Sequence, residues 1–263
     1  MKCALTIAGS DPIGGAGIQA DIKAMASLGV HAHTVITAIT SQNTFSVSSV
    51  MPVPCETILS QMDSVLSDSD VRSVKTGMLY SSEIINAVVE CLSDVGVPMV
   101  SDPVMIASSG GKLASDGFLR SVKEKLLQVC DIITPNRYEA EAISGMKIDN
   151  EEDAMRACEL ISRNGNSVYL KGGHFESDIV TDIIYHNKEF KRLEFPRLER
   201  AGHGSGCTLS AFITANLAKG LDLMDSIVSA RELMQDSIAS MYVVGKGEKV
   251  VDPTASVRHD RKL

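Results

Sequence analysis

The chain has 263 residues, of which 44% are hydrophobic and 22% charged, a composition typical of a globular protein with one or two domains. Its formal net charge of −8 argues against binding to nucleic acid or to an anionic membrane surface. The six cysteines are dispersed without a CxxC pair, so their spacing predicts neither a zinc site nor a disulfide framework. We therefore expect reduced thiols in a cytoplasmic protein.

The first apolar run, residues 3–8, is too short for a signal peptide and predicts a strand. Further strand-like runs follow at regular intervals, with amphipathic helical patterns between them. The predicted strands after the first are 33–40, 71–76, 98–101, 131–134 and 167–170, then a hairpin of 179–185 and 190–195. The predicted helices include residues 58–66, 84–92, 205–220 and 222 to about 242. No uncharged apolar run reaches transmembrane length, so we expect no membrane-spanning segment.

The regular alternation of strands and helices predicts an α/β fold with a doubly wound, mostly parallel sheet and helices on both faces. No linker rich in Pro, Gly or Ser interrupts the pattern, so we expect residues 1–263 to form a single domain. In such sheets ligands bind beyond the carboxyl ends of the strands. Candidate site residues are therefore the polar ones that directly follow each predicted strand.

A glycine-rich segment, residues 9–21, follows the first predicted strand. Residues 15–20 match the dinucleotide-binding pattern GxGxxA. That function also requires an acidic residue about 20 positions later, and the end of the second predicted strand has none, which disfavours nicotinamide binding. The alternatives are a tight strand-to-helix turn, or a loop that lets substrate approach the backbone, with Asp21 and Gln42 projecting from neighbouring strand ends.

Three later strand ends carry polar side chains suited to phosphate chemistry. Asp102 lies at the end of one strand, where it is either a metal or substrate ligand or a turn residue. Asn136 and Glu139 lie three residues apart at a helix start, a spacing suited to hydrated magnesium or to an ordinary capping box. Lys171 precedes two glycines, so it either reaches a phosphate or is a solvated turn residue.

Residues 201–209 combine alternating glycines with the start of an apolar helix. Gly204 and Gly206 allow close backbone approach, and the helix N-terminus favours an anion such as phosphate. Cys207 lies in the same positive field, so we expect a lowered pKa and a role as base or nucleophile. The alternative is a small buried hydrophobic residue that packs the helix start.

Eight segments carry a family resemblance, and they occur in family order at residues 8–11, 14–21, 40–44, 75–79, 102–104, 134–139, 171–174 and 204–210. Together they closely resemble the hydroxymethylpyrimidine (phospho)kinases of thiamine biosynthesis, in the ribokinase-like superfamily. The resemblance implies ATP-dependent phosphorylation of 4-amino-5-hydroxymethyl-2-methylpyrimidine and of its monophosphate, with Mg²⁺ as cofactor. A homodimer is the expected assembly. No thiamine-phosphate synthase segment follows Leu263, so we expect any later step to lie on another chain.

The resemblance also implies a role for each matched position. The implied sets are Cys207, Gly204 and Gly206 for catalysis; Gly9, Asp21, Gln42, Met78 and Val104 for the pyrimidine; Lys171, Ser205 and Arg231 for ATP; and Asp102, Asn136 and Glu139 for magnesium. Cys207 is implied to be the base, at a position where the wider superfamily usually has aspartate. Ser205 replaces the threonine of many relatives and keeps the hydroxyl group. Arg231 aligns with a position that can carry lysine, and both residues are cationic.

Three other functions are weighed against this one. A pyridoxal kinase of the same superfamily is the nearest, because related proteins with the same cysteine-type anion hole phosphorylate that ring alcohol. A non-catalytic sensor of pyrimidine or nucleotide is the second, and the complete set of site residues argues against it. A nicotinamide-dependent oxidoreductase is the third, disfavoured by the missing acidic residue.

Overall fold

The structure is a computed structural model that describes residues 1–106, 113–173, 177–198, 202–255 and 257. Ala201 and His174, which belong to two of the sequence motifs, lie outside these ranges. The described residues form one sheet of nine strands in the order β3-β2-β1-β4-β5-β6-β7-β8-β9. The strands are β1 Lys2–Ser10, β2 Val30–Gln42, β3 Val47–Pro52, β4 Val71–Thr76, β5 Met99–Ser101, β6 Ile132–Ile133, β7 Ser167–Leu170, β8 Ile179–His186 and β9 Glu189–Pro196.

The six central strands of the sheet are parallel, and antiparallel strands extend it at both edges. β1 pairs in parallel with both β2 and β4, and parallel pairing continues through β5 and β6 to β7. β3 pairs antiparallel with β2, while β8 and β9 form the expected hairpin beyond β7. The chain turns from β2 back across β1 to β4, so the sheet is doubly wound, as predicted. The α/β fold class is confirmed.

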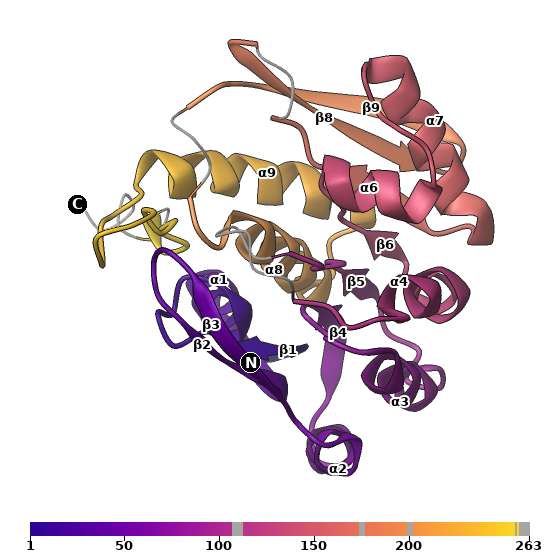
Figure 1. The fold of residues 1–263 in the computed structure, drawn as a ribbon, viewed down its shortest axis with the longest axis vertical. Helices are drawn as coiled ribbons and strands as arrows, with labels where there is room; N and C mark the ends of the chain where they lie inside the picture. The colour runs from indigo at the N-terminus through magenta and orange to yellow at the C-terminus, as the bar shows by residue number, and fades with distance from the viewer. Residues whose placement is uncertain (107–112, 174–176, 199–201, 256, 258–263) are drawn as a thin grey trace.

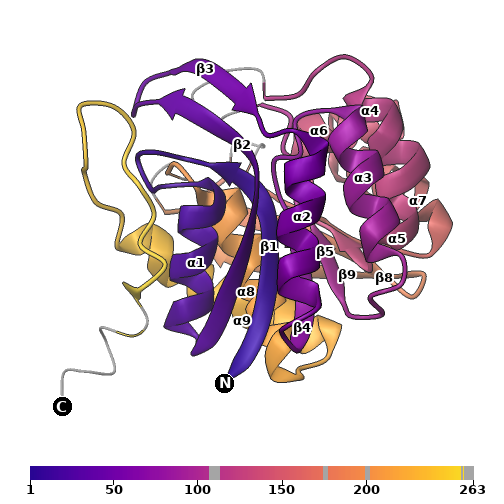
Figure 2. The ribbon, with the colours of Figure 1, turned by 90° about the horizontal axis from the view of Figure 1, so that it is seen from below.

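Helices cover both faces of the sheet (Figures 1 and 2). The helices are α1 Gly17–Ser27, α2 Cys55–Leu66, α3 Ser82–Leu92, α4 Phe118–Ser121, α5 Leu127–Val129, α6 Arg137–Ser144, α7 Glu151–Ile161, α8 Ser205–Lys219 and α9 Leu223–Ala239, with a π-helical turn Val122–Leu126 and a 3₁₀ turn Ser162–Asn164. One apolar core lies under α1, α8 and α9, and another lies under α2, α3 and α7. No helix in the described ranges is both long enough and apolar enough to cross a membrane.

Several predicted elements match the structure, others differ from it at their ends, and one strand was missed. β4 and β7 have their predicted bounds, and Asn187 and Lys188 have the positive φ angles of a tight hairpin turn between β8 and β9. β3 was not predicted, because this edge strand is largely exposed and has no continuous apolar run. The last helix ends at Ala239 rather than near Tyr242, because Tyr242 pairs with Val250 in an antiparallel bridge.

Candidate active site

A cavity of about 810 Å³ opens beyond the carboxyl ends of the parallel strands, where the fold class predicts ligand binding. Residues at or just beyond the carboxyl ends of β1, β2, β4, β5, β6 and β7 meet the start of α8 around it. Every predicted site residue except one lines the cavity: Gly9, Gln42, Met78, Asp102, Val104, Asn136, Glu139, Lys171, Gly204, Ser205, Gly206, Cys207 and Arg231. Asp21 is the exception, since its side chain is fully buried in α1.

The start of α8 has the backbone geometry of an anion site. Gly204 caps the helix with a left-handed φ of 89°, and a Cβ at this position would overlap the Gly15 carbonyl oxygen. The first intrahelical bond runs from the Thr208 N–H to the Gly204 carbonyl, so the N–H groups of Gly206 and Cys207 have no acceptor within the helix. These two N–H groups and the helix dipole favour a negatively charged ligand.

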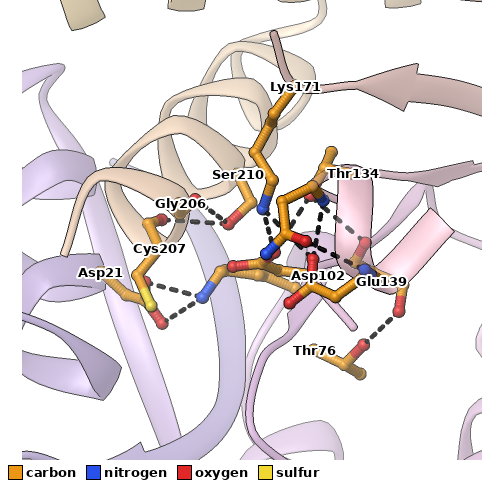
Figure 3. Close-up of polar contacts among 12 residues, drawn as sticks. Asp21, Thr76, Asp102, Thr134, Glu139, Lys171, Gly206, Cys207 and Ser210 are labelled. Carbon is orange, nitrogen blue, oxygen red and sulfur yellow. Dashed lines mark hydrogen bonds and ion pairs between the residues drawn. The ribbon is translucent and has the colours of Figure 1, made fainter. Parts of the chain in front are cut away.

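A compact cluster of three charged side chains lies next to α8 (Figure 3). Lys171 Nζ is 2.9 Å from Asp102 Oδ1 and 3.7 Å from Glu139 Oε2. A Cβ at Gly206 would lie 3.1 Å from the same Nζ, so glycine lets the ammonium group lie close to the helix start. Burial raises the pKa of Glu139 to about 7, and the nearby Asp102 carboxylate adds to the effect, although Lys171 opposes it. Glu139 is therefore only partly ionised near neutral pH.

The two carboxylates of this cluster fit a magnesium ion that is held mainly by substrate. Within the described residues no group of three or more His, Cys, Asp or Glu side chains could form a metal cage. Magnesium commonly needs only one or two carboxylates, with phosphates and water as its other ligands. Asn136 Oδ1 accepts the Glu139 N–H at 2.9 Å, and Glu139 Oε2 accepts the Asn136 N–H at 2.7 Å. The capping box is thus present, and Asn136 orients the Glu139 carboxylate.

Cys207 lies at the cavity wall, but the prediction of a lowered pKa was wrong. Burial raises the pKa of its thiol to about 12. The charges of Asp102 and Asp21 raise this pKa further, whereas the charge of Lys75 and a hydrogen bond from the Gly17 N–H lower it. The helix dipole favours the thiolate, but the cost of desolvating a buried thiolate is larger. The thiol is therefore mainly protonated in the unliganded protein.

The Asp21 carboxylate holds a buried lysine instead of facing the cavity. Both of its oxygens lie 2.8 Å from Lys75 Nζ, and the Thr6 hydroxyl donates to Oδ2 at 2.6 Å. Thr6 and Lys75 are register partners on β1 and β4, so their side chains leave the same face of the sheet and meet α1. The expected projection of Asp21 from a strand end was therefore wrong.

Another part of the cavity lining is apolar. Met78 packs with Leu113 and Val104, and a Cβ at Gly9 would lie only 2.9 Å from the Met78 sulfur. Gln42 lies at the carboxyl end of β2, where its side chain hydrogen bonds to Asp11. Apolar walls beside one amide suit a flat, mostly apolar ring with a polar edge.

Sequence reasoning missed Asp11 and His203, which tie the glycine loop to α8. Asp11 Oδ2 accepts the N–H groups of Gly15 and Ala16, and His203 Nε2 lies 2.9 Å from the same oxygen. Burial alone raises the pKa of Asp11, but hydrogen bonds from His203, Gln42 and loop N–H groups lower it to about 2. An Asp three positions after the predicted first strand, before a glycine loop, was the available sequence signal.

A second missed group, around Asp182 on β8, lies at the Lys171 end of the cavity. Asp182 Oδ2 accepts from the Tyr169 hydroxyl and from Arg231 Nε, both at 2.6 Å, and Oδ1 accepts from the Gly172 N–H at 2.5 Å. Arg231 also stacks 4.2 Å from the centre of the Phe195 ring. Arg231 therefore lines the cavity with its guanidinium group already fixed. Asp182 connects that group to the loop that follows Lys171.

Comparison with known proteins extends over nearly the whole chain. The family described as phosphomethylpyrimidine kinase matches residues 11–252. The chain is 43% identical over 249 residues to the hydroxymethylpyrimidine/phosphomethylpyrimidine kinase of Rhizobium meliloti (strain 1021), covering 93% of this chain and 94% of that protein. The fold resembles a Staphylococcus aureus pyridoxal kinase in complex with AMP-PCP and pyridoxal, with a TM-score of 0.90, 32% identity and coverage of 98% and 95%. It also resembles a phosphomethylpyrimidine kinase from Clostridium difficile 630, with a TM-score of 0.81, 38% identity and coverage of 90% and 100%.

Proposed function

The chain belongs to the phosphomethylpyrimidine kinase family, and from this we propose how its cavity carries out the reaction. It is an ATP-dependent kinase of thiamine biosynthesis that phosphorylates 4-amino-5-hydroxymethyl-2-methylpyrimidine and then its monophosphate. One observation carries the assignment of the site: a single cavity is lined both by the anion-binding start of α8 and by Gln42 with its apolar neighbours. The first part suits the phosphates and the second suits the pyrimidine ring.

We assign phosphate binding to the α8 end of the cavity. The ATP phosphates would lie between Lys171 and the N–H groups of Gly206 and Cys207, with Ser205 beside them. These groups are fixed before the substrate arrives, so they stabilise the charge that develops on the transferred phosphoryl group without reorganisation. Asp182 and Arg231 keep the loop after Lys171 in place. This arrangement is supported by the cavity lining, because the residues assigned here to phosphate binding and those that hold the loop all line one cavity.

We assign the magnesium site to Asp102 and Glu139, with Asn136 orienting Glu139 through the capping box. A bound magnesium ion would neutralise phosphate charge there. The residues of the chain perform the remaining functions. Gln42 orients the ring, Met78 and Val104 exclude water from its faces, and Cys207 accepts the proton of the substrate hydroxyl group.

Replacing Gln42 by alanine is expected to raise the KM for the pyrimidine about tenfold and to change the KM for ATP less than about twofold. The amide is the polar group that we match to the aminopyrimidine edge, and losing a paired donor and acceptor costs about this much. Steady-state kinetics with each substrate varied in turn measures both constants. Gln61→Ala is the matched control, because Gln61 bonds to the β2 backbone at Ile36 and is not part of the cavity wall. Equal increases in both KM values for Gln42→Ala would contradict this assignment.

Pyridoxal phosphorylation is the second candidate activity. It is supported by the similarity of the fold to the Staphylococcus aureus pyridoxal kinase, whose complex contains AMP-PCP and pyridoxal. Both alcohols are hydroxymethyl groups on a flat heteroaromatic ring, so the same anion site could serve either. We expect the aminopyrimidine to be preferred, because Gln42 offers a planar donor and acceptor pair to its amino edge.

The proposal extends to the form of the protein. We propose that residues 1–263 act as one kinase domain and that two copies form a homodimer. We also propose a cytoplasmic location, because all six cysteines, each within the described residues, are free thiols.

A further inference from the structure

The buried pair of Lys75 and Asp21 lies directly behind the start of α8. Both side chains are fully buried, and both Asp21 oxygens contact Lys75 Nζ at 2.8 Å. Both Asp21 oxygens accept from Lys75 Nζ, and Oδ2 also accepts from the Thr6 hydroxyl, which is the hydrogen bonding of an ionised carboxylate. Buried ion pairs add little net stability, because desolvation offsets their attraction. The location of this pair is therefore more informative than its strength.

Asp21 accepts only some of the hydrogen bonds that the Lys75 ammonium group can donate. An ammonium group has three N–H donors, and two of them point to Asp21. Within the described part of the chain no oxygen accepts the third. A Cβ at Gly77 would lie 3.2 Å from Nζ, so the glycine after β4 leaves space beside the ammonium group. Lys75 therefore has a donor and a positive charge available to a neighbour.

That neighbour is the Cys207 side chain. Figure 3 shows Asp21 and Cys207 next to each other, and Lys75 Nζ lies 2.8 Å from both Asp21 oxygens, so the ammonium group lies beside the thiol as well. In agreement with this placement, the charge of Lys75 lowers the pKa of Cys207. The Gly17 N–H at the start of α1 hydrogen bonds to Cys207 as well. The sulfur thus lies between the N-terminal ends of α1 and α8, with a buried cation behind it.

We propose that Lys75, held in place by Asp21, is a positioning residue that stabilises the anionic form of the Cys207 side chain. The inference rests on the proposed kinase function. During phosphoryl transfer the substrate O–H bond breaks, an S–H bond forms on Cys207, and the substrate oxygen bonds to the γ-phosphorus as the bond to the ADP oxygen breaks. Lys75 keeps its proton throughout. Its positive charge lowers the free energy needed to form the Cys207 thiolate before the substrate proton is transferred.

The charged groups around the sulfur predict the effect of each substitution. Lys75 on β4 and Lys171 after β7 favour the thiolate, whereas Asp21 on α1 and Asp102 after β5 oppose it. Removing the Asp21 charge alone leaves Lys75 unopposed and favours the thiolate. Removing both charges of the pair eliminates one of the two cations that favour the thiolate and so disfavours it. A purely structural role would instead loosen the packing in both variants.

The test compares alkylation of Cys207 by iodoacetamide at pH 8.5 in the full-length chain, with the Cys207 peptide measured by mass spectrometry. The sulfur is reachable because Cys207 lines the cavity. We expect Asp21→Asn to be alkylated at least about threefold faster than the unmodified protein, and Lys75→Met/Asp21→Asn at least about threefold slower. The double variant replaces the ion pair with neutral side chains, so no unpaired charge is left buried.

Two other thiols in the same samples serve as internal controls. Cys91 on α3 is partly exposed and reports the activity of the reagent, whereas Cys158 on α7 is fully buried and reports unfolding. If Cys207 reacts as fast in the double variant as in the unmodified protein while Cys158 stays protected, the inference is overturned. Faster reaction of both Cys207 and Cys158 in the two variants would show a structural role and would also overturn it.

Kinase assays on the same proteins separate this inference from the proposed function. The double variant is expected to lose kcat at least about tenfold, with the KM for ATP changed less than about threefold. If the fall in kcat of the double variant does not accompany a fall in the alkylation rate of Cys207, the role of Lys75 is contradicted. An unmodified protein without kinase activity would refute the proposed function, and the alkylation comparison would still decide the effect of Lys75 on the thiol.

Discussion

Cys207→Ala is expected to lower kcat about 100-fold to 10,000-fold while leaving the Kd for ATP within about twofold of its original value. This is the usual range for removing a group that accepts a proton in the transition state. The backbone N–H of residue 207 remains at the start of α8, so the phosphate site is retained. Burial raises the pKa of the thiol to about 12, which makes the thiolate a minor species near neutral pH.

The same pKa fixes the pH dependence of this loss. Below a pKa of about 12 the thiolate fraction rises with pH, so kcat of the unmodified enzyme should increase between about pH 6 and pH 9. The alanine variant should show a flatter profile, so the ratio of the two rates should grow with pH. Cys158→Ala is the matched control, because Cys158 is fully buried in α7 and does not line the cavity. Unchanged kcat in Cys207→Ala would contradict the role of Cys207.

Gly204→Ala is expected to lower kcat about 100-fold or more. The backbone at this position has φ of 89°, and the new Cβ would overlap the Gly15 carbonyl oxygen. The start of α8 must then move away from the glycine loop, which misplaces the Gly206 and Cys207 N–H groups relative to the phosphates. In other anion holes, the loss of a single N–H donor typically lowers kcat by about 100-fold to 1,000-fold.

Gly220→Ala is the control that separates the effect of a strained backbone from the effect of a steric clash between the new Cβ and its neighbours. Gly220 caps the other end of α8 with φ of 97°, and a Cβ there would meet nothing within 4 Å. Both variants should lose stability to the left-handed backbone, by about 1–2 kcal/mol in urea unfolding. Only Gly204→Ala should lose kcat strongly. Similar kcat values for the two variants would contradict the anion-site assignment.

The sequence was sufficient for the parallel sheet because its strands are buried on both faces and appear as continuous apolar runs. β7 is buried throughout, whereas β4 is buried except at Arg72 and mixes apolar with polar residues; the bounds of both were predicted correctly. β3 could not be found this way, because this largely exposed edge strand interrupts its apolar residues with two serines and has no such run. The loops after the strands were predictable as site residues because parallel strands end at one edge of the sheet.

The parts of the site that were missed or wrong all depend on burial. Asp21 follows a glycine loop, and only the fold shows that α1 turns its carboxylate into the sheet toward Lys75. A lysine inside the apolar strand 71–76 was the signal for a buried acidic partner. The pKa of Cys207 was wrong for the same reason, since the cost of desolvation exceeds the helix dipole and becomes visible only with the neighbouring side chains in place.

The most direct test of the kinase assignment is the mass of the product formed from ATP and 4-amino-5-hydroxymethyl-2-methylpyrimidine, with pyridoxal as a competing substrate in equal concentration. We expect the pyrimidine monophosphate to appear first and then to be converted to the diphosphate, with one ADP released for each phosphate added. We also expect pyridoxal phosphate to form more slowly than either pyrimidine product. Formation of pyridoxal phosphate without a phosphorylated pyrimidine, or no release of ADP with the pyrimidine, would contradict this assignment.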